Sequence, residues 1–414
     1  MKHRSKRKGS GLLVLSELYL PVKGGHVVWL HEICRRWSGV RLLTNRHAGC
    51  PARESIDGVD VRRINLSRWS VLRPESLVLY GNLLLQSLRE CRANHPLAIL
   101  AARVLPEGFV ANAVGRLARG LSVVMAHGEE IAPCLPGKPL PARRRATTWL
   151  KRKLLWRTFR RANLVVANSG FTRDLLLAGG VRADRVAVVH PGTDPERFRP
   201  MPKDAELSRL LKIEGRRVLL TVGRLTPRKG QDVTLRALPA IREHCPDALY
   251  VIAGDGEYRN ELSRLADELG VSDSVRFLGE VSDASLPSIY SIADVFVMPN
   301  RVLSGSDVEG FGIVFLEAAA CGLPVVAGRS GGVPDAVSDN VTGLLVDGSS
   351  VSEVAAAIVR LLTDNQLACR MGAAGRDRVC GGLTWSQSAE RIMQLVRQVA
   401  DQHGMCAGDG QAWH

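Results

Sequence analysis

Runs of apolar residues alternate with amphipathic stretches along this chain, and this alternation predicts an α/β protein. An uninterrupted apolar run over residues 11–15 predicts a buried strand. The glycine loop at 21–25 then opens a helix whose apolar positions include Trp29, Ile33 and Trp37. Strand, glycine loop and helix in this order are typical of an open sheet covered by helices.

A proline-rich connection separates this first half from a second series of strands and helices. Strands are predicted at 162–168 and 186–190, and the second of them runs into the proline-rich stretch 191–200. We place a domain boundary near 193–213. Beyond it, strands and helices alternate through residue 363, the pattern of a doubly wound parallel sheet.

The length of the chain agrees with two domains, because 414 residues exceed what one hydrophobic core usually supports. We predict one Rossmann-like domain over 1–193 and a second over 194–382. A further helix is predicted at 383–400, and residues 401–414 are predicted to be a disordered tail.

Charge distinguishes the two halves of the chain. Residues 1–200 hold 35 Lys and Arg against 14 Asp and Glu, a net charge of +21, whereas residues 201–414 hold 21 against 27, a net charge of −6. A one-sided excess of this size predicts an anionic partner for the first half, which could be a phospholipid surface, a nucleic acid or an acidic acceptor.

The nine cysteines are scattered, without a Cys-x-x-Cys pair or a histidine at ligand spacing. Neither a disulfide framework nor a zinc site is therefore predicted. No apolar stretch reaches membrane-spanning length, and the basic start of the chain lacks the pattern of a signal peptide. These features predict a cytoplasmic protein. No cofactor is expected, and no metal requirement is predicted, because no Asp-x-Asp ligand pair stands at a plausible strand end.

The segment 307–317 carries the strongest chemical signal. Glu309 precedes a predicted helix, and Glu317 stands eight positions later, expected about two turns into that helix. Gly310 and Gly312 remove side chains that would keep an anion away from the free amides of the helix N-terminus. A sugar nucleotide fits this pattern, with its diphosphate at the helix and its hydroxyls on the two carboxylates. Exposed glutamates in a good helix sequence are the ordinary alternative.

A cationic loop follows an apolar strand predicted from residue 216 onward. The loop contains Arg224, Arg228 and Lys229. Ligands of open α/β sheets bind beyond the carboxyl ends of the strands, so these cations are expected to face the same crevice as the Glu309 helix. Arg224 and Lys229 are candidate diphosphate ligands. A solvated basic loop is the alternative.

Together, these segments resemble the retaining glycosyltransferases of the family 4 type, which have two facing Rossmann-like domains (the GT-B type) and a deep interdomain cleft. The similarity extends over most of the second half. Its motifs are Gly223-Arg224 with Lys229-Gly230, the turn 253–256, segment 277–281, the Glu309 and Glu317 pair, and 331–335 followed by 343–347.

The resemblance implies a role for each domain. The first domain would bind the acceptor, the second would bind the donor, and the helix at 383–400 would cross back onto the first. Gly24 and Gly25 would approach the donor diphosphate, and His127 would contact the sugar near the reaction centre. The implied donor-binding residues are Gly24, Gly25, Gly223, Arg224, Lys229, Val281, Glu309, Gly310, Phe311, Gly312, Ile313 and Glu317, and the implied catalytic residues are His127, Arg224, Lys229 and Glu309. Paired glycines in a tight turn and a structural histidine are the ordinary alternatives.

The resemblance also implies a mechanism. In front-face transfer with retention, the departing diphosphate oxygen accepts the proton of the acceptor hydroxyl. Arg224, Lys229 and the amides near Gly312 would stabilise the charge that builds up on the leaving group. Within the family, the similarity leans toward the phosphatidylinositol mannosyltransferases, which use GDP-mannose. A hexosyl unit, leaning toward mannose, would then pass to a hydroxyl of a lipid-linked acceptor or an envelope glycan precursor.

The segment 143–161 contains nine Lys and Arg residues, two tryptophans and no acidic residue. This composition predicts a helix that lies on the inner face of an anionic membrane. The alternative is a surface helix whose apolar stripe packs on its own domain. The candidate membrane or acceptor contacts are Arg143, Arg144, Arg145, Lys151, Arg152 and Lys153.

Two other functional classes stay open at this point. Nucleotide-sugar epimerases share the architecture and would release a free sugar epimer or hydrolysis product without an acceptor. A nucleic-acid-binding protein is suggested by the sequence pI of about 9.8. Against it, only 5% of the residues are aromatic, no helix-turn-helix or stacking motif is present, and the acidic second half would repel a phosphate backbone.

Overall fold

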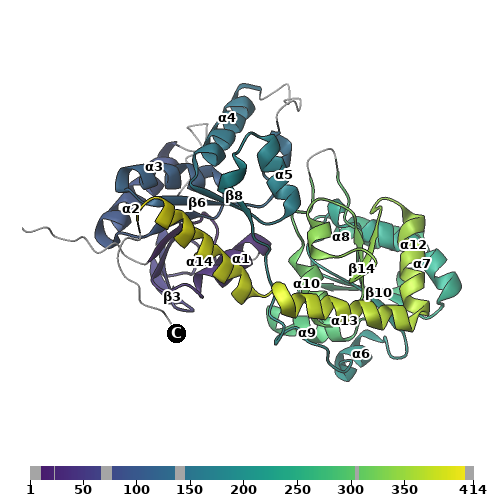
Figure 1. The fold of residues 1–414 in the computed structure, drawn as a ribbon. Helices are drawn as coiled ribbons and strands as arrows, with labels where there is room; N and C mark the ends of the chain where they lie inside the picture. Colours follow the sequence, from purple (N-terminus) through teal and green to yellow (C-terminus); the bar gives the residue numbers. More distant parts are fainter. Residues whose placement is uncertain (1–10, 23, 67–76, 136–144, 304–306, 406–414) are drawn as a thin grey trace, which may run out of the picture. The chain divides into compact units, whose positions relative to one another are not determined.

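The chain divides into two compact units, which are described separately (Figure 1). Unit 1 comprises Met1–Val189 and Trp385–His414, and unit 2 comprises His190–Thr384. The computed structural model describes residues 11–22, 24–66, 77–135, 145–303 and 307–405.

The boundary predicted at 193 lies inside unit 2. The backbone amide of Thr193 donates to the carbonyl oxygen of Leu383 at 2.9 Å, so the strand-like residues after Val189 pair with the end of unit 2. The predicted limit at 382 likewise lies two residues before the end of this unit, at Thr384.

Unit 1 is built on an eight-stranded sheet in the order β3-β4-β2-β1-β5-β6-β7-β8. All neighbouring strands are parallel except the β3–β4 hairpin at one edge. Strands β1, β5 and β7 are apolar along their whole length and fully buried, as expected for a parallel sheet covered on both faces. The strands are β1 (Leu12–Leu15), β2 (Val40–Asn45), β3 (Arg53–Ile56), β4 (Val59–Ile64), β5 (Ala98–Ala101), β6 (Leu121–Ala126), β7 (Leu164–Ala167) and β8 (Val186–Val188).

Helices connect these strands, and the last helix of the chain returns to unit 1. The helices are α1 (Gly25–Cys34), α2 (Leu77–Asn94), the π-helical segment η1 (Val104–Gly108), α3 (Phe109–Ala118), α4 (Arg145–Arg161), α5 (Gly170–Ala178) and α14 (Trp385–Gln402). The buried positions of α14 recur every three or four residues, so one face packs against the unit. On that face Ser388 accepts a hydrogen bond of 3.0 Å from the indole N–H of Trp29 in α1.

Unit 2 contains a six-stranded, fully parallel sheet in the order β11-β10-β9-β12-β13-β14. Successive residues of its central strand enter different cores: Leu219 packs in one, and Val218 and Leu220 in the other. Apolar cores therefore cover both faces. The strands are β9 (Arg217–Val222), β10 (Ala248–Ala253), β11 (Val275–Gly279), β12 (Val295–Met298), β13 (Val325–Gly328) and β14 (Gly343–Val346).

The helices of unit 2 follow the strands in alternation, as the sequence pattern predicts. They are α6 (Ala205–Leu211), η5 (Pro227–Lys229), α7 (Gln231–His244), α8 (Arg259–Glu268), α9 (Leu286–Ser291), α10 (Ile313–Ala320), α11 (Val333–Ala336), α12 (Val351–Thr363) and α13 (Asn365–Gly382).

Each sheet has one topological switch point, where the strand order reverses. In unit 1 the chain leaves β1 toward β2 and later returns to β5 on the other side of β1. In unit 2 it leaves β9 toward β10 and returns to β12 on the other side of β9. Ligands of doubly wound sheets bind at this point, beyond the carboxyl ends of the strands.

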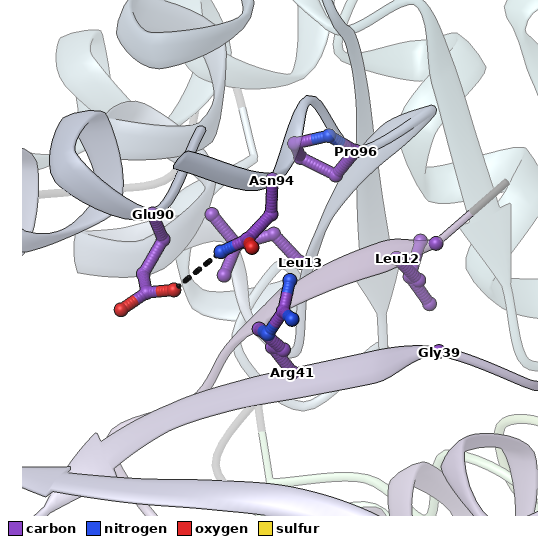
Figure 2. Close-up of a pocket in the computed structure, with 8 residues that line it drawn as sticks. Leu12, Leu13, Gly39, Arg41, Glu90, Asn94 and Pro96 are labelled. Atoms are coloured by element: carbon purple, nitrogen blue, oxygen red, sulfur yellow. Dashed lines mark hydrogen bonds between the residues drawn. The ribbon is translucent and has the colours of Figure 1, made fainter. Parts of the chain in front are cut away.

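A pocket at the opposite, amino-terminal edge of the unit 1 sheet is shown in Figure 2. Its carboxylate, Glu90, already accepts hydrogen bonds from Asn94 of the pocket at 3.0 Å and from Arg62 outside it at 2.7 Å. We assign this pocket to the structure of the sheet edge rather than to catalysis.

Candidate active site

Two loops meet at the switch point of unit 2. The loop after β9 carries Arg224, Arg228 and Lys229, and the loop after β12 carries Glu309. The loops touch at Gly230, whose φ is 75°, and a Cβ atom there would lie 2.1 Å from the carbonyl oxygen of Pro299. Only glycine permits this approach, which brings the cations to the carboxylate.

Glu309 is the centre of a hydrogen-bond network. Its Oε2 atom accepts from Lys229 Nζ at 2.6 Å, from Arg228 Nη1 at 2.8 Å and from Asn300 Nδ2 at 3.2 Å. Burial opposes its ionisation, but the charges and hydrogen bonds of Lys229 and Arg228 outweigh burial and hold the pKa of Glu309 below its ordinary value. Glu309 is therefore an ionised carboxylate with a fixed orientation. Its Oε1 atom takes no part in these bonds.

The three cations of the loop after β9 differ in what they already bind. Arg228 also forms an ion pair with Asp307, with an Nε to Oδ1 distance of 2.9 Å. The side chain of Arg224 is exposed, and it forms no ion pair within the described part of the chain. Arg224 is thus the cation of this loop that is open to an incoming anion, whereas Lys229 would share its charge between Glu309 and a ligand.

The N-terminus of α10 lies directly after this loop. Gly312 precedes the helix with a φ of 90°, and no side chain caps the first turn. The amides of Ile313 and Val314 are consequently left without a side-chain partner, which is the arrangement that binds phosphate at helix N-termini.

Glu317 lies closer to the start of α10 than the sequence suggested. The helix begins at Ile313, so Glu317 is about one turn into it and not two, because the glycine-rich segment before Ile313 is not helical. Oε2 of Glu317 accepts a hydrogen bond of 2.7 Å from the Tyr290 hydroxyl. Burial raises the pKa of Glu317, partly offset by the Tyr290 bond. The bond orients the carboxylate through its Oε2 atom.

The other predicted donor-binding residues fall into two groups. Gly223 and Ile313 are partly exposed beside the network, and Val281 follows β11 and packs partly against the core. Gly310 and Phe311, in contrast, are buried. The Phe311 ring stacks on His190 with the ring centroids 5.4 Å apart, so its side chain supports the loop that carries Glu309.

In unit 1, His127 follows β6 and is buried. Its Nε2 atom lies 2.8 Å from the carbonyl oxygen of Ala102, and because a carbonyl can only accept, Nε2 carries the proton. Burial lowers the pKa of His127 to about 4, so the ring is neutral near pH 7 and Nδ1 is an acceptor. The His26 ring lies 5.8 Å from it, centroid to centroid.

Gly24 and Gly25 stand at the start of α1, next to His26. A Cβ atom on Gly24 would make only ordinary contacts, 3.5 Å from the His26 ring, and its φ of 166° is extended. Packing does not require glycine at this position. The absence of a side chain leaves room for a ligand instead.

The basic helix α4 packs with one half and exposes the other. Leu155, Trp156 and Phe159 are buried, and the Trp156 indole donates to the carbonyl oxygen of Cys134 at 2.7 Å. Trp149 and Leu150 are 53% and 52% exposed. The apolar stripe in the second half of the helix therefore packs on its own unit, as the surface-helix alternative predicted. The first half presents apolar and cationic side chains to solvent.

The six candidate membrane contacts are only partly covered by the structure. Lys151 and Lys153 are exposed on α4, with Lys153 Nζ 4.9 Å from the centre of a Trp149 ring, and Arg152 is partly buried. Arg145 opens α4, but its side chain is outside the described part, as are Arg143 and Arg144 altogether.

Sequence reasoning missed several residues of these sites. Arg228 and Asn300 bind Glu309 directly, and Tyr290 binds Glu317. In unit 1, Glu107 and Glu130 are acidic groups beside the His127 strand whose pKa values burial raises to about 7 and about 8. The sequence placed Arg228 in the cationic loop without assigning it a role in the site. Glu130 stands three positions after His127, whereas nothing in the sequence marked Glu107.

Over the described residues, no group of three or more His, Cys, Asp or Glu side chains is placed to hold a metal ion. Among the helices described, none is long and apolar enough to span a bilayer.

Comparison with known proteins now identifies the family. The model "Glycosyl transferases group 1" matches residues 202–378, and "Glycosyltransferase Family 4" matches residues 23–197. The chain is 36% identical over 406 residues to a GDP-mannose-dependent alpha-(1-6)-phosphatidylinositol monomannoside mannosyltransferase of Mycobacterium tuberculosis, covering 94% of this chain and 98% of the relative. The chain belongs to the family 4 glycosyltransferases. Over about half of its length, this glycosyltransferase is also 38% identical to a D-inositol 3-phosphate glycosyltransferase of Thermobifida fusca.

Solved structures agree on the fold of this glycosyltransferase. HepE of Anabaena in complex with UDP superposes with a TM-score of 0.75 at 21% identity, covering 94% of this chain and 99% of HepE. Sucrose-phosphate synthase of Thermosynechococcus elongatus gives 0.77 at 22% identity, covering 95% and 100%. The two doubly wound units are thus the two Rossmann-like domains of the GT-B fold.

Proposed function

We propose that this glycosyltransferase moves mannose from GDP-mannose to a hydroxyl of a phosphatidylinositol mannoside, with retention of the anomeric configuration. The observation that carries the proposal is the near full-length similarity to a mannosyltransferase of this specificity. The similarity to inositol 3-phosphate glycosyltransferases covers only about half of the chain, so a lipid-borne acceptor is favoured over a soluble one.

The donor would bind at the switch point of unit 2. Its diphosphate would receive hydrogen bonds from the open N-terminus of α10 and from Arg224, with Lys229 shared between the diphosphate and Glu309. The Oε1 atoms of Glu309 and Glu317 would accept from sugar and ribose hydroxyls.

The state of the carboxylates supports front-face transfer. A double displacement needs an available carboxylate nucleophile and a partner acid about 5 Å away. The negative charge of Glu309 is instead compensated by ion pairs with Lys229 and Arg228, and Glu317 is oriented by Tyr290. The enzyme would therefore act by stabilising charge on the leaving diphosphate, whose oxygen takes the proton of the acceptor hydroxyl. This stabilisation would need no divalent metal.

An anionic membrane would present the acceptor to unit 1. Helices α2, α3 and α4 pack in sequence on this unit. In their described part they expose eight cations and no acidic side chain, and a ninth exposed cation, Arg119, directly follows α3. The exposed cations are Arg89, Arg92, Arg116, Arg119, Lys151, Lys153, Arg157, Arg160 and Arg161. With Trp149 and Leu150 exposed among them, this face combines charge attraction with interfacial apolar groups. The enzyme would then work at the inner face of the membrane.

A turnover screen tests the proposal. The purified protein is incubated with GDP-, UDP- or ADP-sugars, and with either phosphatidylinositol mannoside in vesicles or soluble inositol phosphate. We expect turnover with GDP-mannose and the lipid, and a product whose anomeric one-bond C–H coupling matches the α configuration of the donor. Preference for a UDP-sugar, for the soluble acceptor or for an inverted product would contradict the corresponding part. Free epimer or sugar released without acceptor would favour the epimerase or hydrolase alternative.

A further inference from the structure

Two loops also meet at the switch point of unit 1, and one side chain joins them. The loop after β1 runs through Glu17 to Gly24, Gly25 and His26, and the segment after β5 is the π-helical turn η1. Glu107 in η1 accepts a hydrogen bond of 2.8 Å at Oε1 from the backbone amide of Glu17. This bond crosses from one side of the switch point to the other.

Glu107 is an unusual residue for this task because its carboxyl group is buried, with only 1% of the residue exposed. Its second oxygen, Oε2, is buried and has no hydrogen-bond partner in the described part of the chain. Burying a polar atom without a partner destabilises the folded state, so a simple structural contact would not favour a glutamate here.

The charged and titratable groups that face Glu107 come from four elements. They are Glu17 after β1, Tyr80 in α2, Arg103 after β5 and Glu130 after β6. From α4, the uncharged Thr158 packs against the next residue, Gly108. Arg103 is the sole cation of this set, and two acids oppose it. Burial raises the pKa of Glu107 to about 7, which the Glu17 hydrogen bond and Arg103 only partly counter.

The unit 1 residues assigned to substrate either lie in the loop after β1 or are bound to the segment after β5. His127 donates to the carbonyl oxygen of Ala102, next to Arg103, and thereby fixes its ring to the β5 side. His26 belongs to the β1 side, where Tyr19 and Leu20 are anchored through His31 at 2.7 Å and Arg63 at 2.6 Å. Those anchors tie the loop to α1 and β4 and not to β5. Glu107 supplies the tie to β5.

We propose that Glu107 is a positioning residue for sugar transfer: it holds the loop after β1 against the end of β5 and so sets Gly24, Gly25 and His26 relative to His127. The role in transfer rests on the proposed function, whereas the tie between the loops does not. Because Glu107 changes charge near neutral pH among the groups named above, the tie is sensitive to pH.

Three variants of the full-length protein test this role. Glu107→Ala removes the acceptor, and Glu107→Gln keeps a carbonyl oxygen for the Glu17 amide but cannot ionise. Glu90→Ala is the matched control, because Glu90 is also a buried carboxylate in unit 1 that accepts two hydrogen bonds, but it lies at the opposite edge of the sheet (Figure 2).

Hydrogen–deuterium exchange without substrate gives the first readout. Losing one hydrogen bond of about 1 kcal/mol should speed exchange in residues 16–22 about fivefold in Glu107→Ala. Glu107→Gln should match the wild type at pH 6, and Glu90→Ala should leave this segment unchanged. Between pH 6 and 8 the wild-type exchange, corrected for the intrinsic rate, should change, whereas that of Glu107→Gln should not. Unchanged exchange in Glu107→Ala, or an equal change in Glu90→Ala, would overturn the proposal.

Steady-state kinetics gives the second readout. With the donor that the wild-type enzyme uses, we expect Glu107→Ala to lower kcat/KM about tenfold. Glu107→Gln should have a kcat/KM within about twofold of the wild-type value at pH 6. Its kcat/KM should stay constant from pH 6 to pH 8. A Glu107→Gln profile identical to that of the wild type would contradict the proposal. A wild-type enzyme inactive with GDP-mannose would count against the proposed function alone, because the exchange experiment contains no substrate.

Discussion

The ammonium group of Lys229 lies 2.6 Å from Oε2 of Glu309, at the point where the loops after β9 and β12 meet. Arg228 binds the same oxygen at 2.8 Å. The pair fixes a lysine that would otherwise be a long, mobile side chain. It also leaves a carboxylate whose charge is compensated before any ligand arrives.

Lys229→Ala is expected to lower kcat about 10²–10³-fold, as removal of one donor to a developing anion typically does. Glu309→Gln should reduce activity by a similar factor, because it loses the charge that holds Lys229 and Arg228. The exposed Lys203 of the same unit pairs with Asp294 at 2.8 Å, and Lys203→Ala serves as the control. Near-normal turnover of Lys229→Ala with unchanged thermal melting would show that the donor diphosphate binds elsewhere.

Glu317→Gln should remove most activity while the protein stays folded, because Gln cannot accept at both positions. Tyr290→Phe is the milder change: it removes only the bond that orients Glu317, and we expect mainly a higher KM for the donor, about threefold to tenfold for one hydrogen bond of about 1 kcal/mol. Saturation kinetics distinguishes the two effects. A Tyr290→Phe enzyme that lost kcat and kept its KM would show that Glu317 acts on the transition state and not on donor binding.

Transfer should proceed in EDTA at the rate seen without it, since Arg224, Lys229 and the α10 N-terminus supply the positive charge that a metal would otherwise bring. The measurement is initial rate against EDTA concentration, with magnesium or manganese added back. Activity that EDTA abolishes and a metal restores would contradict this expectation.

Glu130 should make the stability of the protein fall with rising pH. Burial raises its pKa to about 8, so the folded protein holds this proton more tightly than the unfolded chain. The stabilisation is complete below the ordinary glutamate pKa of 4.5 and is lost as the pH rises through about 8. The melting temperature of Glu130→Gln minus that of the wild type should therefore increase from pH 5 to pH 9. The control is Glu129→Gln, which changes the exposed neighbour. Parallel curves of melting temperature against pH for all three proteins would refute the raised pKa of Glu130.

Vesicles that contain anionic lipid should float with the protein at low salt and release it at high salt, because exposed charges are screened within about 10 Å at 0.1 M. Changing Lys151, Arg152 and Lys153 to Ser should weaken binding about a hundredfold, at about 1 kcal/mol for each cation. The matched control changes Arg173, Arg182 and Arg185 of the same unit to Ser. Equal flotation of both triple variants would mean that α4 is an ordinary surface helix.

The fold could be predicted because its signals are local. The apolar run of β1 and the glycine loop before α1 each specify an element within a few residues, and the structure has both. The meeting of the cationic loop after β9 with the Glu309 loop after β12 could be predicted for the same reason, because neighbouring parallel strands end at the same edge of their sheet.

The partners within the sites could not be predicted in the same way. Arg228 and Glu309 are 81 positions apart in the sequence, and their contact depends on how the loop after β12 folds. The burial of Glu107 depends on how η1 packs against the loop after β1. Periodicity likewise could not say which half of α4 is packed, since Trp156 is held by the carbonyl oxygen of Cys134 in a separate loop.

The return of α14 to unit 1 has a consequence for how the protein is made. Trp29 in α1 forms its hydrogen bond with Ser388, which leaves the ribosome 359 residues later. Unit 2, an uninterrupted segment, has all of its residues available before that partner emerges. Domains generally fold as units during synthesis, so the unit whose synthesis starts first is the last to become complete. Until then, the α1 face that α14 will cover is exposed on the nascent chain.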